Sequence, residues 1–324
     1  MNQAFAIGID IGGTNTKFGI VDQQGKVLDE GEVKTTSFPT INSFVEGIYK
    51  QLQPLIAKAG KENIKGIGIG APNGNHFNGC IEHAPNLHWK GIVPIADLVS
   101  KKFELPCILN NDAKAAALGE LHFGAARNMK DFIMITLGTG VGSGIVVNGQ
   151  LLYGHKGNAG ELGHTVIRPN GRQHWSTGLK GTVESYCSAT GIAITAREMA
   201  QQSEEPTLLK RYSAAEITSK VVDECAEKGD AVAKKVYQFT GELLGEALAN
   251  FVLFSAPEAI ILFGGVTKAG ELILEPAKKS MEEHLLTAFK GQVKLMFSQL
   301  KASDAAILGA SSMVWNLKTD EQPD

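Results

Sequence analysis

Residues 9–21 read Ile9-Asp10-Ile11-Gly12-Gly13-Thr14-Asn15-Thr16-Lys17-Phe18-Gly19-Ile20-Val21, and residues 135–147 read Ile135-Thr136-Leu137-Gly138-Thr139-Gly140-Val141-Gly142-Ser143-Gly144-Ile145-Val146-Val147. Both stretches have the pattern of a strand, a turn of glycine and threonine, and a second strand. The Asn148-Gly149 pair after the second stretch is a strong hairpin signal. The repeat predicts a duplicated lobe with one glycine turn in each half of the chain.

The first half continues with alternating strands and helices. The opening hairpin extends into a meander of three strands that ends near residue 34. Apolar residues then recur at helical spacing over 41–59, where Pro54 should kink or shorten the helix. A strand over 64–70 follows, and a later strand over 107–110 leads into a helix over 113–121. Asn111-Asp112 lies at that last junction, where α/β sheets tend to bind their ligands.

The second half repeats this alternation. The pattern predicts helices over 191–202, 214–228 and 230–254, a strand over 259–263 that ends at Gly264-Gly265, a helix over 271–289, a strand over 293–297, and a helix over 305–315 capped by Asp304. We expect an α/β protein with a small lobe made of residues 1–115 plus about 303–324, and a large lobe made of residues 116–302.

Composition excludes several classes of protein. Hydrophobic residues make up 43% of the 324 residues and charged residues 20%, which is a balance that excludes wholesale disorder. The net charge of −3 offers no excess of cations for nucleic acid. No apolar run approaches the roughly 20 residues that span a bilayer, and the start lacks a signal-peptide pattern. We therefore expect a cytoplasmic protein without nucleic-acid or membrane partners.

The two glycine turns have the composition of a phosphate clamp. Gly12, Gly13 and Thr14 in the first turn, and Gly138, Thr139 and Gly140 in the second, offer backbone amides and hydroxyls that no bulky side chain shields. The alternative is that these glycines serve hairpin geometry alone. Two turns at matching positions favour the phosphate clamp.

Asp10 is a carboxylate at the end of an apolar strand, directly before the first glycine turn. Burial of such a group is costly unless it meets a cation or hydrogen-bond donors. Next to phosphates it would hold Mg²⁺, usually through water. The alternative is an Asx turn, in which Asp10 accepts hydrogen bonds from the amides of Gly12 and Gly13.

Four motifs occur in order along the chain: Ile9-Asp10-Ile11-Gly12-Gly13-Thr14, Asn111-Asp112-Ala113, Leu137-Gly138-Thr139-Gly140-Val141-Gly142 and Glu161-Leu162-Gly163-His164. In this combination the chain resembles the ROK family (repressor, open reading frame, kinase), and specifically its glucokinase-like sugar kinases. The resemblance covers nearly the whole chain. It implies the two-lobed, ribonuclease-H-like fold that actin, hexokinase and the heat-shock ATPases share, with a cleft between the lobes.

The resemblance also implies the roles of the site residues. Asp112 would be the general base, and a carboxylate suits a reaction that needs positioning and an acceptor for the proton of a hydroxyl. The sugar would be bound by Asn86, Asn111, Asp112, Glu161, His164 and Glu184. Without the resemblance, Asp112 reads as a helix N-cap, Glu161 as a solvated loop residue and His164 as a structural histidine.

Gly264-Gly265 follows a buried strand and corresponds to the turn on the adenosine side of the family's nucleotide site. Without a side chain there, a purine would lie against the backbone. A simple turn at the entry to a helix is the alternative interpretation.

The chain departs from the family in one segment. The zinc-bearing members have three cysteines just before the last sugar-binding glutamate, and this chain has Trp175, Thr177 and Thr182 in those places. A single His164 cannot form a tetrahedral zinc site, so we predict that the protein binds no zinc. Hydrogen bonds of Thr177 and Thr182 and packing of Trp175 would hold the loop instead. His155 and His174 are an alternative source of metal ligands.

We therefore expect transfer of the γ-phosphoryl group of ATP, with Mg²⁺, to a hexose hydroxyl, and the 6-hydroxyl of glucose is the favoured acceptor. N-acetylmannosamine, N-acetylglucosamine, mannose and fructose are alternative acceptors, and polyphosphate is an alternative donor. A sugar-sensing regulator is an alternative of another class. Such regulators carry a helix-turn-helix ahead of the sugar domain, whereas the first strand here starts by Phe5. A homodimer is the expected assembly.

Overall fold

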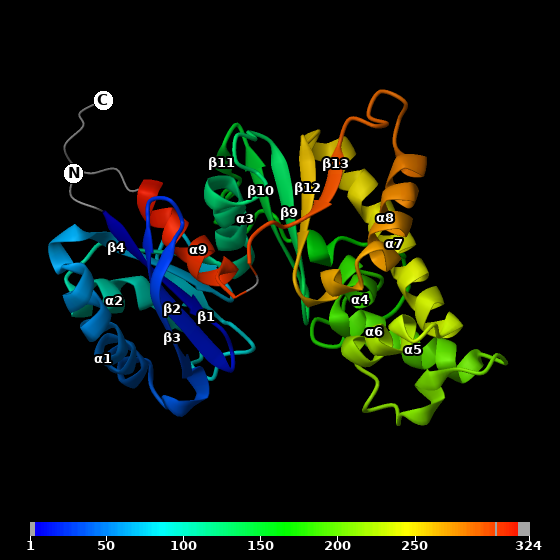
Figure 1. The fold of residues 1–324 in the computed structure, drawn as a ribbon, viewed down its shortest axis with the longest axis horizontal. Helices are drawn as coiled ribbons and strands as arrows, with labels where there is room; N and C mark the ends of the chain where they lie inside the picture. The colour runs from blue at the N-terminus through cyan, green and yellow to red at the C-terminus, as the bar shows by residue number, and fades with distance from the viewer. Residues whose placement is uncertain (1–3, 302, 317–324) are drawn as a thin grey trace. The chain divides into compact units, whose positions relative to one another are not determined.

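The computed structural model describes residues 4–301 and 303–316, which form two compact units (Figure 1). The first unit contains the described chain up to Met129, Gly144–Ala159 and the described chain from Gln299. The second contains Lys130–Ser143 and Gly160–Ser298. The division into lobes at residue 116 stays a prediction, and residues 317–324 of its small lobe lie outside the described residues.

Two five-stranded sheets have the same strand order. The first runs β3-β2-β1-β4-β8 and the second runs β11-β10-β9-β12-β13. Their strands are β1 (Phe5–Ile11), β2 (Asn15–Asp22), β3 (Val27–Lys34), β4 (Ile64–Ala71), β8 (Cys107–Asn111), β9 (Phe132–Leu137), β10 (Val141–Val147), β11 (Gln150–Leu151), β12 (Ala259–Phe263) and β13 (Lys294–Phe297). In the first sheet β1, β2 and β3 pair antiparallel, and β4 and β8 join in parallel. In the second, β12 is parallel to β9 and β13 to β12. The shared order confirms the duplication that the two hairpins predict.

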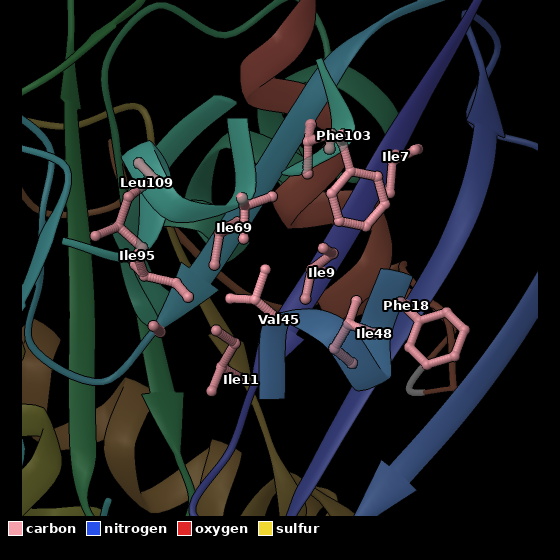
Figure 2. Close-up of a cluster of buried hydrophobic side chains, with 14 of the residues drawn as sticks. Ile7, Ile9, Ile11, Phe18, Val45, Ile48, Ile69, Ile95, Phe103 and Leu109 are labelled. Carbon is pink, nitrogen blue, oxygen red and sulfur yellow. The ribbon is translucent and has the colours of Figure 1, made fainter. Parts of the chain in front are cut away.

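The first unit buries one face of its sheet under two helices. These are α1 (Ile41–Ala59) and α2 (Ile95–Phe103), which lie on the opposite side of the sheet from α9 (Ala305–Ser312) (Figure 1). Figure 2 shows the resulting core, in which alternate residues of β1 meet apolar residues of β4, β8, α1 and α2. The labelled side chains are Ile7, Ile9, Ile11, Phe18, Val45, Ile48, Ile69, Ile95, Phe103 and Leu109. Helix α3 (Asp112–Phe123) packs against α9.

Glycines bring α9 directly onto the other face of this sheet. A Cβ atom at Gly8 would lie 2.2 Å from the carbonyl oxygen of Ile307, and one at Gly68 would lie 1.8 Å from that of Ala310. Neither position therefore tolerates a side chain without displacing the helix. Because side chains alternate along a strand, Asp10 of β1 points to this same face.

The second unit is mostly helical around its part of the second sheet. Its helices are α4 (Val183–Cys187), α5 (Ala189–Gln202), α6 (Ser219–Glu227), α7 (Ala231–Ser255) and α8 (Glu271–His284). Helices α7 and α8 pack along one another, and α8 contacts β13 (Figure 1). None of the helices in the described part of the chain has the length and apolar character needed to cross a membrane.

Short elements complete the description. They are the strands β5 (Gly74–Asn75), β6 (Cys80–Glu82) and β7 (Ile92–Val93), and the 3-10 helices η1 (Thr35–Ser37), η2 (Lys61–Asn63), η3 (Leu162–His164), η4 (Leu208–Arg211), η5 (Gly265–Ala269) and η6 (Met313–Asn316). Strands β5, β6 and β7 form a small sheet of their own within the long loop that follows β4.

The structure contradicts the expected shortening of α1 and the expected cap of α9, while a kink at Pro54 stays a prediction. Pro54 does not shorten α1, which runs as one element to Ala59. Pro54 lies on the exposed side of the helix, and burial of the opposite face, which includes Phe44 and Leu52, offsets the missing hydrogen bond. Asp304 occupies the N-cap position of α9, but its side chain makes no capping hydrogen bond. Helix α9 ends at Ser312 and continues as the 3-10 helix η6.

Two helices of the second unit are shorter than their patterns predict. Helix α8 ends at His284 because Leu285 is extended and buried, and the amide of Gly291 then turns back to the Glu282 carboxylate. Helix α6 starts at Ser219, where Thr218 caps it by accepting a hydrogen bond from the amide of Val221. The capping threonine therefore decides the start of α6 more strongly than the apolar pattern before it.

Candidate active site

The strand register of the first unit brings Asp10 and Asp112 together. Asp10 of β1 pairs with Gly70 of β4, and Gly70 pairs with Asn110 of β8. The three strands are parallel, so their carboxyl ends meet at one edge of the sheet. A Cβ atom at Gly70 would lie 3.4 Å from Asp10 Oδ1 and 3.7 Å from the Cα atom of Asp112. The Asp10 carboxylate and the backbone of Asp112 therefore both lie beside a position that has no side chain.

Asp10 has the electrostatics of a cation ligand. The pKa of its carboxyl is raised to about 7, mainly by burial and in part by the Asp112 charge, while Lys17 opposes the shift. The amide of Gly12, which an Asx turn would direct to Asp10, donates instead to the backbone oxygen of Asn15 at 3.0 Å. No hydrogen bond from another described residue reaches the Asp10 carboxylate. The carboxylate is thus available to a ligand.

Asn111, not Asp112, caps α3. The Asn111 Oδ1 atom accepts hydrogen bonds from the amides of Ala113 at 3.0 Å and Lys114 at 3.4 Å. Asp112 is the first residue of the helix and its side chain is exposed, so a ligand can reach the carboxylate. Desolvation by the surrounding protein raises the pKa of Asp112, although hydrogen bonds from the amide of Ala113 and from Asn111 partly oppose the shift. The N-cap interpretation of Asp112 is therefore wrong.

The first glycine turn packs on the loop that carries Asn86. A Cβ atom at Gly13 would lie 2.7 Å from the Asn86 carbonyl oxygen and 3.4 Å from its Cβ atom. Gly12 and Gly13 are partly exposed, and Thr14 and Asn86 are exposed. The structure therefore brings Asn86 next to the glycine turn.

Three residues that the sequence analysis did not single out support this end of the sheet. The buried amide of Asn110 donates from Nδ2 to the Tyr153 hydroxyl at 3.1 Å. Lys114, which is 3% exposed, donates from Nζ to the Gly157 carbonyl at 2.5 Å. The segment that contains Tyr153 and Gly157 is thereby tied to the strand end and to the first turn of α3. A lysine at a buried helical position was the only signal of this contact in the sequence.

In the second unit, the start of α5 holds the second glycine turn. Gly138 donates from its amide to the Gly140 carbonyl at 3.0 Å, and the Gly138 carbonyl accepts from the amide of Ala189 at 2.8 Å. The Thr139 carbonyl accepts from the Thr190 hydroxyl at 3.0 Å. The Gly138 and Thr139 carbonyls are thus held by α5, while the Thr139 side chain stays exposed.

Gly264 lies beside this same turn. It has a φ of +113°, and a Cβ atom there would lie 2.4 Å from the Leu137 carbonyl oxygen. Gly265 has no described atom within 4 Å of the place where its Cβ would be. The parallel pair β9 and β12 thus ends with the Gly138–Gly140 turn next to Gly264-Gly265.

The Glu184 carboxylate is fixed by donors on both of its oxygens. The amide of Val141 donates to Oε2 at 2.6 Å, and His174 Nε2 lies 2.6 Å from Oε1. A Cβ atom at Gly140 would lie 2.5 Å from Oε2. Glu184 therefore packs directly on the second glycine turn, and residue 140 must be glycine for the carboxylate to keep this position.

With the sugar-binding role of Glu184 that the resemblance implies, Gly140→Ala is expected to weaken sugar binding. The added methyl group must displace the Glu184 carboxylate, so we expect kcat/KM for glucose to fall about tenfold or more. Steady-state kinetics with purified protein measure the effect. Gly138→Ala is the matched control for stability, because its methyl group meets nothing within 4 Å and the melting temperature should stay unchanged. If Gly140→Ala leaves the kinetics with glucose unaltered, Glu184 does not bind the sugar from this position.

His174, His164 and Glu184 form one cluster, and Glu161 lies at its edge. The His164 and His174 rings meet edge to face, with centroids 5.8 Å apart, and His164 Nδ1 is buried without a hydrogen-bond partner among the described residues. Glu161 is exposed, and its carbonyl accepts a hydrogen bond from the His164 amide at 3.1 Å. Glu161, His164 and Glu184, which the sequence predicts as sugar ligands, thus lie in one part of the second unit.

The segment in place of the zinc-binding cysteines is organised differently from our expectation. Trp175 is 44% exposed and its ring lies tilted against that of His174, with centroids 4.2 Å apart, so it is not the packing centre of the loop. The buried group is His174, which is 2% exposed. The Thr177 hydroxyl bonds His174 Nδ1 at 2.9 Å and Thr182 caps α4, so both threonines make the polar links that the sequence predicts.

The described residues do not contain a grouping of three or more His, Cys, Asp or Glu side chains arranged to hold a metal ion. The His164 and His174 pair therefore does not fit a zinc site, which needs four ligands. Asp10 and Asp112 fit a different ion, because Mg²⁺ is commonly bound by one or two carboxylates together with the phosphates of a substrate. The absence of zinc itself stays a prediction.

Comparison with known proteins identifies the family. The ROK family profile matches residues 6–316, so the chain belongs to the ROK family. It is 35% identical to the glucokinase of Halalkalibacterium halodurans over 99% of this chain and 97% of that protein. It is 32% identical to the glucokinase of Thermotoga maritima over 95% of this chain and 96% of that protein.

A solved structure shows the same fold. It is the ROK family glucokinase of Streptomyces griseus in complex with glucose and AMPPNP, which is 33% identical to this chain. The two structures match over 96% of this chain and 99% of that one, with a TM-score of 0.77. The fold is therefore the ribonuclease-H-like fold of the ROK sugar kinases, with duplicated α/β halves, as the sequence predicts.

Proposed function

We propose that this protein is an ATP-dependent glucokinase, which transfers the γ-phosphoryl group of ATP to the 6-hydroxyl of glucose. The chain is 35% and 32% identical to two glucokinases over nearly its full length, which supports this proposal. The likeness to a glucokinase structure in complex with glucose and AMPPNP supports it as well. The observation in the chain itself that carries the proposal is the closeness of Asp10 and Asp112 beside Gly70, where the charge of Asp112 raises the pKa of Asp10. One is free to bind a cation, and the other is exposed at the start of a helix.

Asp112 is the general base of the proposed reaction. Phosphoryl transfer needs a positioned hydroxyl and an acceptor for its proton. The raised pKa of Asp112 makes its carboxylate a stronger proton acceptor than an ordinary surface aspartate, and Asn111 holds the start of α3 that presents it. Asn111 and Asn86 bind sugar hydroxyls from the same unit.

Asp10 holds the Mg²⁺ ion that accompanies ATP, usually through water. When bound, the ion neutralises charge that develops on the phosphoryl oxygens. Asp10 meets this requirement because its carboxylate has no competing hydrogen bond within the described chain. Gly12, Gly13 and Thr14 of the first turn contact phosphates beside it.

The second unit supplies the remaining contacts in this proposal. Glu184, His164 and Glu161 bind the hydroxyls of the sugar, since each carboxylate oxygen accepts hydrogen bonds from adjacent hydroxyls. The Gly138–Gly140 turn binds phosphate through Thr139, whose side chain is exposed at the tip of the turn. The adenosine lies along Gly264-Gly265, where the space beside Gly265 holds no described atom within 4 Å of the place of a Cβ.

The proposal extends to setting and assembly. ATP is a nucleotide of the cell interior, so we place the enzyme in the cytoplasm, where it would catalyse the first step of glucose metabolism. It works without zinc, because a hydrogen-bonded loop replaces the cysteines, and it forms a homodimer, the commonest assembly of soluble enzymes. Size-exclusion chromatography with light scattering measures the assembly, and metal analysis of the purified protein measures zinc.

An assay of ADP release tests the reaction. Protein washed with EDTA and supplied again with Mg²⁺ is mixed with ATP and each of glucose, mannose, fructose, N-acetylglucosamine and N-acetylmannosamine. We expect the highest kcat/KM with glucose and no requirement for added zinc. Polyphosphate in place of ATP, with sugar phosphate as the readout, tests the alternative donor. A higher kcat/KM with another sugar would replace glucose as the acceptor, and no turnover with any sugar would favour a sugar-binding regulator.

A further inference from the structure

The cluster of His164, His174 and Glu184 in the second unit is centred on His174, which has no proposed contact with substrate. His174 is 2% exposed, and it lies in the loop before α4, where the chain bridges back through the pair Gln173 and Lys180. Its ring is bonded at both nitrogens. The Trp175 ring contacts it in a tilted arrangement, with centroids 4.2 Å apart, and the ring of His164 meets it edge to face at 5.8 Å.

The hydrogen bonds fix the protonation state of His174. Nδ1 lies 3.2 Å from the backbone nitrogen of Thr177 and 3.4 Å from that of Ser176. A backbone N–H can only donate, so Nδ1 must accept and carries no proton. The Thr177 hydroxyl, at 2.9 Å, donates to the same atom. The single ring proton therefore lies on Nε2, which donates to Glu184 Oε1 at 2.6 Å. His174 is neutral, and its contact with Glu184 is a hydrogen bond rather than an ion pair.

This arrangement links the loop backbone to the carboxylate proposed to bind sugar. One oxygen of Glu184 accepts from Nε2 of His174 and the other accepts from the amide of Val141 at 2.6 Å. The two donors approach from different segments, so the plane of the carboxylate is fixed. Without His174, Oε1 would lose its donor and the carboxylate could rotate about the remaining bond.

We infer that His174 is a positioning residue, whose neutral imidazole with the proton on Nε2 orients the Glu184 carboxylate, and with it the His164 ring, for the sugar. The inference rests on the proposed glucokinase function. It assigns to one buried histidine the task of holding a loop that has no metal site among its described residues. His174 touches neither sugar nor phosphate in this role and acts through Glu184.

Three substitutions separate hydrogen bonding from packing. His174→Ala removes the ring, His174→Phe keeps a ring without donor or acceptor, and His174→Gln keeps one N–H donor and one acceptor. We expect KM for glucose to rise about tenfold or more in the Ala and Phe variants, because the partly buried Glu184 carboxylate loses its donor. KM for ATP should change less than about twofold, and His174→Gln should recover most of the affinity for glucose. His284→Ala is the control, since it removes a histidine that bonds the Ser280 carbonyl in the same unit.

The outcomes are distinguishable. If wild-type protein does not phosphorylate glucose, the proposed function fails. If wild-type protein is active and His174→Phe keeps the wild-type KM for glucose, or His174→Gln is as impaired as Phe, the role of His174 is refuted.

A measurement on wild-type protein covers the case in which the variants do not fold. Long-range ¹H–¹⁵N spectra should show His174 as the neutral form with its proton on Nε2, and its signals should shift when glucose is added. A proton on Nδ1, or signals that glucose leaves unchanged, would overturn the inference.

Discussion

Asp112→Asn should remove nearly all turnover and leave glucose binding largely intact. Asparagine keeps the size and the hydrogen-bonding geometry of the side chain at the start of α3, but it cannot accept the proton of the attacking hydroxyl. We expect kcat to fall about 10²- to 10⁴-fold, which is the usual contribution of a general base. The affinity for glucose, measured by calorimetry, should change by less than about threefold, because Asn111 and Glu184 keep their positions.

Asp97→Asn is the matched control for this substitution. Asp97 also lies in the first turn of a helix of the first unit, where it is exposed and pairs with Lys101 at 2.6 Å. Loss of its charge removes a favourable interaction with the helix dipole without touching the site. Its kcat should equal that of the wild type. A similar kcat in Asp112→Asn and Asp97→Asn would show that Asp112 is not the base.

Asp10→Asn should abolish most activity and at the same time stabilise the ligand-free protein. Asparagine cannot neutralise a magnesium ion, so kcat/KM should fall at least about 100-fold, which corresponds to ~3 kcal/mol of lost transition-state stabilisation. The same change removes a buried negative charge that lies close to Asp112. The melting temperature at pH 8 should therefore rise by about 2–4 °C, the shift that roughly 1 kcal/mol gives in a large domain.

The stabilisation should depend on pH in a defined direction. The pKa of Asp10 is raised from 3.8 to about 7 in the folded protein, so the folded state binds the proton more tightly than the unfolded state. Wild-type stability therefore falls as the pH rises from about 4 to 7, where Asp10 must ionise against the protein environment. The difference between Asp10→Asn and wild type should be small at pH 5 and largest at pH 8. An equal difference at both pH values would contradict the raised pKa.

The sequence predicts most of the secondary structure because its strands alternate around glycine turns. The hairpins after Ile11 and Leu137 and the Asn148-Gly149 turn are local features, and local chemistry decides them. Asn148 and Gly149 both have positive φ, as that turn requires. The ends of helices were less predictable. Burial of Leu285 decides the end of α8 and capping by Thr218 decides the start of α6, and the spacing of apolar residues shows neither contact.

The arrangement of the site depends on register, which the sequence does not specify. Asp10 and Asp112 were expected at strand ends, but their proximity depends on β4 lying between β1 and β8 with Gly70 at the facing position. The role of His174 was missed for a similar reason. The sequence showed a histidine next to a tryptophan, and only the folded loop shows that the histidine is buried while Trp175 is half exposed.

Transfer of labelled phosphate tests the central claim most directly. The protein is incubated with Mg²⁺, glucose and [γ-³²P]ATP, and the labelled product is separated and its phosphate position determined by NMR. The account predicts that the label moves from ATP to glucose in equal amount to the ADP released, and that the phosphate is on the 6-hydroxyl. Label that appears only as inorganic phosphate, or that stays on ATP while glucose is bound, would contradict it.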